Sequence, residues 1–291
     1  MKRVLKRGVV FWAVFSLWML SLTSMVLGVG CGGGGETGGE GRCGDGVLDP
    51  DEECDDGGRE PLDGCDAQCH REWEGDVAGT LVASPGVDEE TGDATKATNG
   101  VRGCGQGCGS TDVASLSPDP PEDAYIVISW GGRRVTNGPG VDFVVFENPF
   151  DISGGGRVFM DQLVVFLSRD GGTWVPFPHD YTAPDETVYS DDPAHWEGFA
   201  GVTPVLFHEE ENPVDPFHTE VAGGDAFDLA DLPADGGEAE AIRDGGFSYL
   251  KLVVASACEN PDTGESFVSD PMSNGPDIDG VYGRYLESGE R

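Results

Sequence analysis

The sequence predicts an all-β chain, in which a two-sheet jelly-roll sandwich over residues 76–291 follows a small disulfide-rich module over residues 43–71. Three observations predict this class. The 291 residues include 46 glycines and 19 prolines, a composition that favours short strands and many turns over long helices. Hydrophobic residues make up 38% of the chain, which is enough for a core. From about residue 76 onward, strand-length apolar runs alternate with glycine-rich turns.

Five of these runs are rich in Val, Ile and aromatic residues, and they predict strands at 125–130, 142–147, 162–168, 173–177 and 249–255. Several are apolar at every position, as expected where both faces of a strand are covered. The turn Asp170-Gly171-Gly172 predicts a hairpin between the third and fourth strands. Short helices are predicted at 225–232 and 237–243. Short strands with irregular connections are typical of a jelly roll.

Residues 1–30 predict export from the cytoplasm. A basic segment (2–7) precedes an uncharged apolar stretch (8–30), which is the order found in secretory signals. About 20 apolar residues also suffice for an uncleaved membrane-spanning helix. Residues 31–42 can bury little and predict a flexible tether. Cys31, directly after the apolar stretch, resembles the acylated cysteine of a bacterial lipoprotein signal. The membrane is therefore an expected partner, through an N-terminal lipid or a helix, at the outer membrane or cell surface.

Four cysteines in the next segment, Cys43, Cys54, Cys65 and Cys69, predict two disulfides. The segment has few apolar residues, so it needs covalent cross-links to hold a fold. Three pairings are possible, and the spacing selects none of them. Zinc is less favoured, because paired C-x-x-C knuckles are missing and the compartment is oxidising. The motif CGDGVLDPDEECDDG…DGCDAQC closely resembles a Cys-rich repeat of myxobacterial surface proteins. That resemblance implies a spacer or interaction module with no enzymatic role.

Three more cysteines, Cys104, Cys108 and Cys258, lie in the large domain. Cys104 and Cys108 either close a small local loop, or one of them pairs with Cys258. If Cys31 is acylated, seven cysteines remain in the exported part, and one thiol then lacks a disulfide partner.

Two resemblances bear on the large domain. The segment SRDGGTWVPF (168–177) and the later YLKLVV strand resemble the hairpin and pairing strand of discoidin-type, galactose-binding-like jelly rolls. Several segments, including NGPGVDFVVFENPF (137–150) and SNGPDIDGV (273–281), are together similar to a family of bacterial cell-surface proteins. This second resemblance covers about residues 100–285. It implies a surface location and a jelly-roll fold.

The charge balance is strongly acidic, with 54 acidic against 17 basic residues and a net charge of −37. Such a chain repels phosphate backbones, so the sequence predicts no nucleic-acid partner. A self-repelling surface that keeps the protein soluble is one interpretation. Calcium binding is another, because hard cations take carboxylate and carbonyl oxygens as ligands.

Five acidic residues are candidate calcium ligands. Asp277 and Asp279 are two apart in PDIDGV, and alternate residues of a strand point to the same face. Two neighbouring carboxylates repel each other unless a cation lies between them. Asp142 and Glu147 flank the predicted strand DFVVFE, and Asp228 lies among further aspartates in GGDAFDLADL. The galactose-binding-like resemblance implies a structural calcium near the chain ends of the fold, in agreement with the carboxy-terminal pair.

Aromatic side chains predict a carbohydrate site. Sugar rings stack on exposed aromatic rings, because the contact buries the apolar face of the sugar and leaves its hydroxyls free. Trp196 lies in a polar, loop-like stretch and is the main candidate, with Tyr181 nearby. Trp174 and Trp130 lie in predicted strands and are expected in the core.

Catalysis is not predicted by any motif. The segment HEEEN (208–212) lacks the second histidine of a zinc-protease helix, and the sequence has neither a G-x-S-x-G elbow nor a phosphate-binding loop. We therefore expect a surface-anchored, non-catalytic binding or adhesion protein that calcium stabilises and that recognises a glycan or a protein partner. Two alternatives stay open. One is a secreted, carboxylate-dependent hydrolase of polysaccharide or peptide, using Glu209 or Asp228. The other is a structural spacer of the cell envelope.

Overall fold

The computed structural model consists mostly of strands, and 13% of the residues are helical. It describes residues 43–46, 49, 52–55, 57–59, 65–71, 77–88, 92–152, 154 and 156–288. The prediction of an all-β chain is confirmed. The predicted signal or anchor, the tether and Cys31 lie outside the described residues.

The larger sheet has five strands, and every neighbouring pair is antiparallel. Its order is β1 (Thr80–Ala83), β3 (Tyr125–Ser129), β13 (Tyr249–Val254), β8 (Leu163–Ser168) and β9 (Val175–Pro176). Four of the five strands predicted from apolar runs lie in this sheet, close to their predicted bounds. The predicted hairpin is also confirmed, since β8 and β9 pair across the turn at 170–172.

The smaller sheet has three antiparallel strands in the order β12 (Asp225–Phe227), β5 (Phe143–Phe146) and β15 (Gly280–Gly283). The fifth predicted strand corresponds to β5. The helix predicted over 225–232 is wrong, because β12 and the single turn η4 (Leu229–Asp231) occupy that segment. Residues 225–227 pair with β5, a contact between remote segments that local residue spacing does not reveal.

The remaining elements are short. Four two-stranded pairs join β10 (Asp180–Tyr181) to β11 (Trp196–Glu197), β14 (Asp277–Ile278) to β2 (Ala114–Ser115), β16 (Leu286–Ser288) to β4 (Arg133–Val135), and β6 (Phe150–Asp151) to β7 (Val158–Phe159). The α-helices are α1 (Thr219–Ala222) and α2 (Glu238–Gly245), and α2 confirms the helix predicted at 237–243. Four more short 3₁₀ helices, of the same kind as η4, are η1 (Ala94–Thr98), η2 (Pro121–Asp123), η3 (Pro193–His195) and η5 (Ala255–Ala257).

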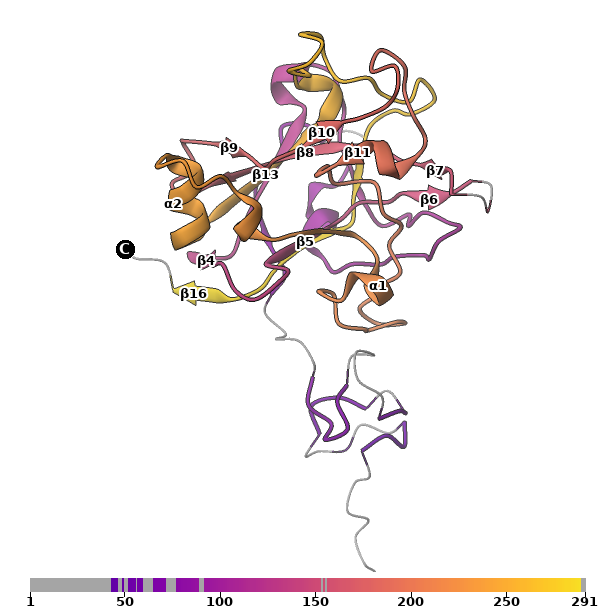
Figure 1. The fold of residues 1–291 in the computed structure, drawn as a ribbon. Coiled ribbons are helices and arrows are strands. Elements are labelled where there is room, and N and C mark those ends of the chain that lie inside the picture. The colour runs from indigo at the N-terminus through magenta and orange to yellow at the C-terminus, as the bar shows by residue number, and fades with distance from the viewer. Residues whose placement is uncertain are drawn as a thin grey trace, which may run out of the picture. The chain divides into compact units, whose positions relative to one another are not determined.

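The main core contains residues from both sheets, which form two layers in Figure 1, with β8 and β13 in one and β5 in the other. The placement of β5 between two buried clusters explains why its sequence is apolar throughout. Phe143 and Val145 point into the main core, whereas Val144 and Phe146 belong to a second buried cluster on the opposite side. The period of two along a strand therefore buries all four side chains.

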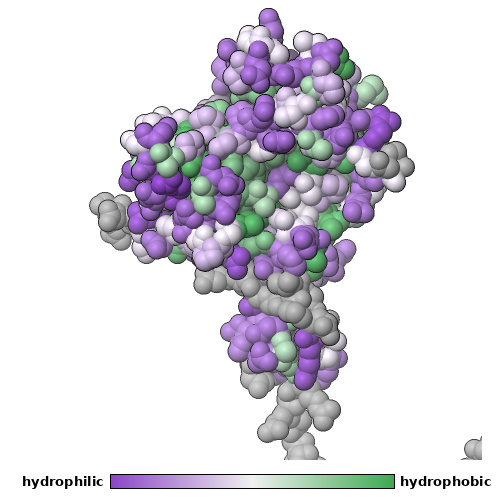
Figure 2. All heavy atoms as spheres, in the orientation of Figure 1, coloured by the Kyte–Doolittle hydropathy of each residue, from purple (hydrophilic) through white to green (hydrophobic). Residues whose placement is uncertain are grey.

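Figure 2 shows hydrophilic residues over most of one face, with hydrophobic residues reaching the surface near its centre. None of the helices in the described part of the chain is long and apolar enough to cross a membrane.

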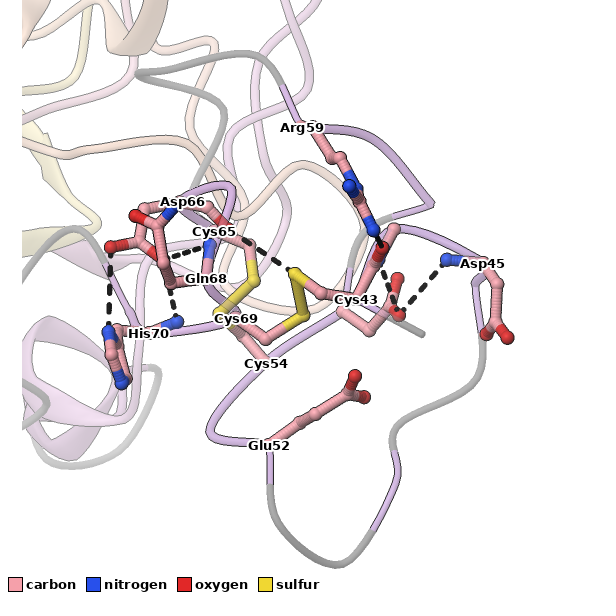
Figure 3. Close-up of a disulfide and its surroundings, with 12 residues drawn as sticks. Cys43, Asp45, Glu52, Cys54, Arg59, Cys65, Asp66, Gln68, Cys69 and His70 are labelled. Atoms are coloured by element: carbon pink, nitrogen blue, oxygen red, sulfur yellow. Dashed lines mark hydrogen bonds and ion pairs between the residues drawn. A yellow bond between two sulfur atoms is a disulfide. The ribbon is translucent and has the colours of Figure 1, made fainter. Parts of the chain in front are cut away.

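The Cys-rich module is cross-linked by two nested disulfides, Cys43–Cys69 and Cys54–Cys65 (Figure 3). The prediction of two disulfides among these four cysteines is thus confirmed, and the first cysteine pairs with the fourth. In the described part of the module, Cys65 and Cys69 are buried and Cys43 and Cys54 are half-buried, which agrees with a fold held by cross-links.

Aspartates organise the turns of this module. The carboxylate of Asp55 accepts backbone N–H bonds from Gly44, Gly46 and Gly57 at 2.8–2.9 Å, and from Asp45 at 3.2 Å. A single side chain thereby accepts hydrogen bonds from the backbone N–H groups of two loops. Asp55 thus has a structural role in addition to its charge.

Candidate functional site

The two carboxylates of the carboxy-terminal D-x-D segment lie among different partners. Strand β14 ends at Ile278 and pairs with β2, whereas β15 begins at Gly280 and pairs with β5. The chain therefore passes from one sheet to another at Asp279. The expectation that Asp277 and Asp279 share one strand face is wrong for this reason, since alternation holds only within a continuous strand.

Asp279 is fully buried and serves the backbone. Both of its carboxylate oxygens lie 3.0 Å from the N–H of Arg102, which donates to them. Burial raises the pKa of Asp279 to about 7, against the lowering effect of that hydrogen bond. The nearby carboxylate of Glu209 accepts the hydroxyl hydrogen bond of Tyr282. Asp279 and Glu209 are therefore both engaged in internal hydrogen bonds.

Asp142 and Asp228 also bind backbone groups. Asp142 is fully buried and accepts N–H bonds from Gly138 at 2.8 Å and from Leu229 at 2.7 Å, one on each oxygen. Burial raises the pKa of Asp142 to about 6. Asp228 caps the turn η4 by accepting the N–H of Ala230 at 2.8 Å. These contacts explain both residues as loop anchors without a metal.

Glu147 differs from these aspartates because one of its oxygens has no hydrogen bond. Its side chain is only 3% exposed, and Oε1 accepts the N–H of Asp277 at 2.6 Å. Oε2 is buried and finds no hydrogen-bond partner among the described residues. Burial raises the pKa of Glu147 well above its usual range, and the carboxylates of Asp161 and Asp277 raise it further, against the lowering effect of the backbone N–H groups of Asp277 and Asn148. An unpartnered, buried carboxylate oxygen costs free energy and requires an explanation.

Asp161 is the member of this group that the sequence did not single out. Burial raises its pKa to about 6, and the carboxylates of Asp277 and Asp270 add to that effect. Asp161 lines a small cavity of about 70 Å³ together with Asp270 and Ser273. No local signal distinguishes Asp161 among 54 acidic residues; only its position directly before a predicted strand sets it apart.

A glycine keeps space open beside these oxygens. Gly201 has φ +83°, and a Cβ atom there would lie 2.3 Å from the carbonyl oxygen of Asp161 and 3.4 Å from Oε2 of Glu147. We call Glu147, Asp161 and Asp277 the acidic cluster. Its oxygen-only donor set, with one buried oxygen unpartnered, fits a hard cation such as calcium.

The carboxylate oxygens of the acidic cluster do not converge on one position that a cation could occupy. In the described part of the chain, the one group of three metal-ligating side chains with all ligand atoms within 4.8 Å of each other is Glu52, Asp55 and Cys69. That group does not favour a metal, because the sulfur of Cys69 is in a disulfide and Asp55 accepts four backbone N–H bonds. In the acidic cluster, a bound cation requires side-chain rotation or bridging water.

The two aromatic residues predicted to bind sugar are buried. Trp196 is 2% and Tyr181 1% exposed, and their ring centroids lie 3.9 Å apart. The indole N–H of Trp196 donates to the carbonyl of Ser190, and the Tyr181 hydroxyl donates to that of Val188. The expectation of an exposed platform here is wrong, because the surrounding polar loop folds around its own apolar cluster.

The two tryptophans predicted to lie in the core, Trp130 and Trp174, differ in burial. Trp130 is buried, as predicted, and its indole N–H donates to the carbonyl of Val77 at 2.8 Å. Trp174 is only partly buried, so its prediction as a core residue is wrong. It follows the glycine turn of the β8–β9 hairpin and reaches the outer face of the larger sheet.

The cysteines of the large domain follow one of the two predicted arrangements. Cys104 and Cys108 form a disulfide with each other. Cys258 is a free thiol, so its assignment to a disulfide is wrong, because both candidate partners are already paired. Burial raises the pKa of Cys258 to about 11, which keeps it protonated.

Comparison of the sequence with protein-family models found no match, and a search of the curated proteins found none either.

Proposed function

We propose that this chain is an exported, surface-tethered and non-catalytic binding protein, whose β-sandwich of jelly-roll type is stabilised by calcium at the acidic cluster. Two antiparallel sheets with eight strands in total and one shared core support the jelly-roll assignment. The basic and apolar start of the sequence, followed by Cys31 and a glycine-rich tether, supports export and anchoring at the outer membrane or cell surface.

The single observation that carries the calcium proposal is the buried, unpartnered Oε2 of Glu147. Without a cation, this side chain avoids a buried charge only by staying protonated, since burial and two neighbouring carboxylates disfavour its ionised form. A calcium ion removes that conflict, because it takes six to eight oxygen ligands and neutralises several carboxylates at once. Glu147, Asp161 and Asp277 would hold it, and the carbonyl of Asp161 faces the same glycine.

The test measures thermal unfolding of the exported protein with calcium and with a chelator. A ligand that binds only the folded state adds about 2.7 kcal/mol at a concentration 100-fold above its Kd. For a domain of this size, each kcal/mol corresponds to roughly 2–4 °C in Tm. We therefore expect calcium at that level to raise Tm by about 5–10 °C.

Substitutions identify the site. Glu147→Gln keeps the shape of the side chain and removes its charge, so we expect it to abolish the calcium-dependent rise in Tm while leaving the metal-free protein folded. Glu122→Gln, an exposed residue outside the cluster, serves as the matched control and should respond to calcium like the wild type. An unchanged wild-type Tm with calcium, together with no calcium in metal analysis, would refute the proposal.

A further inference from the structure

The outer face of the larger sheet is rich in aromatic side chains. It arises because alternate side chains of each strand point away from the core. Along β13, Leu250 and Leu252 point into the main core, so Tyr249 and Lys251 point outward. Lys251 lies opposite Val127 of β3 and opposite Phe166 of β8 in the antiparallel register. Cross-strand neighbours on one face lie within contact distance of each other.

This face is hollowed into a groove of about 350 Å³. We call it the aromatic groove, and it is lined mainly by Val82, Tyr125, Asp170, Trp174, Tyr249 and Lys251. Val82 comes from the edge strand β1 and is 50% exposed. Asp170 and Trp174 come from the β8–β9 hairpin, so the groove crosses the whole sheet.

Lys251 lies at the centre of the aromatic rings. Its Nζ lies 4.5 Å from the ring centroid of Trp174, 5.2 Å from that of Phe166 and 5.4 Å from that of Tyr125. These distances are typical of cation–π contacts. No carboxylate among the described residues forms an ion pair with Lys251, although the chain has 54 acidic and 17 basic residues. Its ammonium donors are therefore available to a ligand.

Asp170 offers an acceptor at the rim of the groove. Its Oδ1 accepts the N–H groups of Gly172 and Thr173, both at 2.8 Å, which fixes the carboxylate on the hairpin. Its Oδ2 has no hydrogen-bond partner among the described residues. The groove thus combines flat aromatic rings with a fixed acceptor and a cationic donor, the combination that recognises polyols.

We propose that the aromatic groove binds a neutral glycan chain, with the apolar face of a sugar ring on Trp174 and hydroxyls on Lys251 and Asp170. Charge selects the class of ligand. A net charge of −37 repels a polyanion, and Lys251 at the centre of the groove repels a cation. The inference rests on the proposed binding function and gives it a site and a ligand class.

The test measures binding of the full exported protein to immobilised neutral polysaccharides (β-glucan, mannan, galactan and xylan), with polygalacturonate as an acidic comparison. We expect Trp174→Ala to weaken binding to the preferred neutral polymer by about tenfold or more. Lys251→Met, which keeps an unbranched side chain, should weaken it as well. Met272→Ala truncates a side chain that is 84% exposed and lies outside the groove, and it should bind like the wild type.

Three outcomes overturn the inference: wild-type affinity in Trp174→Ala, binding of the wild type to the acidic polymer alone, or no binding to any neutral polymer. The calcium response of Tm in the same preparations separates this failure from failure of the proposed function. A protein that responds to calcium but binds no neutral glycan refutes only the groove. If Trp174→Ala loses glycan binding and the wild type shows no calcium response of Tm, only the cation site is refuted.

Discussion

At the scale of single residues, buried carboxylates divide into two kinds. Asp142, Asp225 and Asp279 each accept backbone N–H bonds from segments remote in sequence, and burial raises their pKa values to about 6, about 6 and about 7. They join loops to the sheets without needing an ion. Glu147 lies equally deep but leaves one oxygen unpartnered, and this difference separates a candidate ligand from a structural anchor.

Asp279 predicts a pH dependence of stability. Because the pKa of Asp279 is higher in the folded protein than in the unfolded chain, protonation favours folding. This contribution is complete below the usual pKa of aspartate and is lost as the pH rises through about 7. Its full size is roughly 4 kcal/mol. Asp279→Asn removes the titration, so we expect the variant to gain stability relative to the wild type between pH 5 and pH 8.

The measurement is urea unfolding at both pH values with a chelator present, so that calcium does not contribute. The Glu122→Gln control should follow the wild type at each pH. Equal pH slopes for the wild type and Asp279→Asn would show that Asp279 titrates in the folded protein much as it does in the unfolded chain.

At the scale of elements, the sequence predicts what local pattern determines. Strand β5 is apolar throughout because both of its faces are buried, and β3 and β8 are buried along most of their length, whereas β13 buries every second residue; all four were predictable from their apolar residues. Apart from β9, which the hairpin turn revealed, the two-residue strands were not predicted, and neither was β12, whose partner β5 is remote in sequence. The D-x-D segment shows the same limit. It is broken between β14 and β15 by a change of sheet that no local spacing encodes.

The candidate site was predictable to a similar extent. Glu147 and Asp277 stood out through their positions beside a strong strand and in a D-x-D segment. Asp161 did not, since its role depends on the loop around Gly201 and on the cavity beside Ser273. For the sugar-binding candidates, the sequence predicted exposure where the structure shows burial. Trp196 lies in polar sequence but is buried, because a long loop needs an apolar cluster of its own to be held in place.

The contrast between two tryptophans gives a stability prediction. Trp196 is buried and contacts the rings of Tyr181 and Phe199, so Trp196→Ala should cost about 3–5 kcal/mol of unfolding free energy. Trp174 is partly buried on an open face, so Trp174→Ala should cost clearly less. Urea unfolding of both variants measures the difference. If Trp174→Ala were the more damaging substitution, the groove would have to be part of the core.

At the scale of the whole molecule, charge dominates. With 54 acidic and 17 basic residues, most carboxylates have no basic partner. The ion pairs of the described residues lie at the surface, as between Arg157 and Asp191 or Arg134 and Glu287, where a single pair contributes up to about 1 kcal/mol. The folded chain therefore carries a repulsion that its ion pairs do not offset, and that repulsion is diffuse.

Diffuse repulsion responds to any salt, whereas a cation site responds to a particular ion. Raising sodium chloride from about 0.01 M to about 0.1 M shortens the Debye length from roughly 30 Å to roughly 10 Å. We expect Tm of the chelated protein to rise over this range, because screening weakens repulsion in the compact state more than in the expanded one. Glu147→Gln should show the same rise, since a single charge in −37 changes the total little. If Tm stays level or falls as sodium chloride is added, the acidic residues are spaced widely enough that their mutual repulsion does not destabilise the folded state. The stabilisation expected from calcium would then come from the acidic cluster alone.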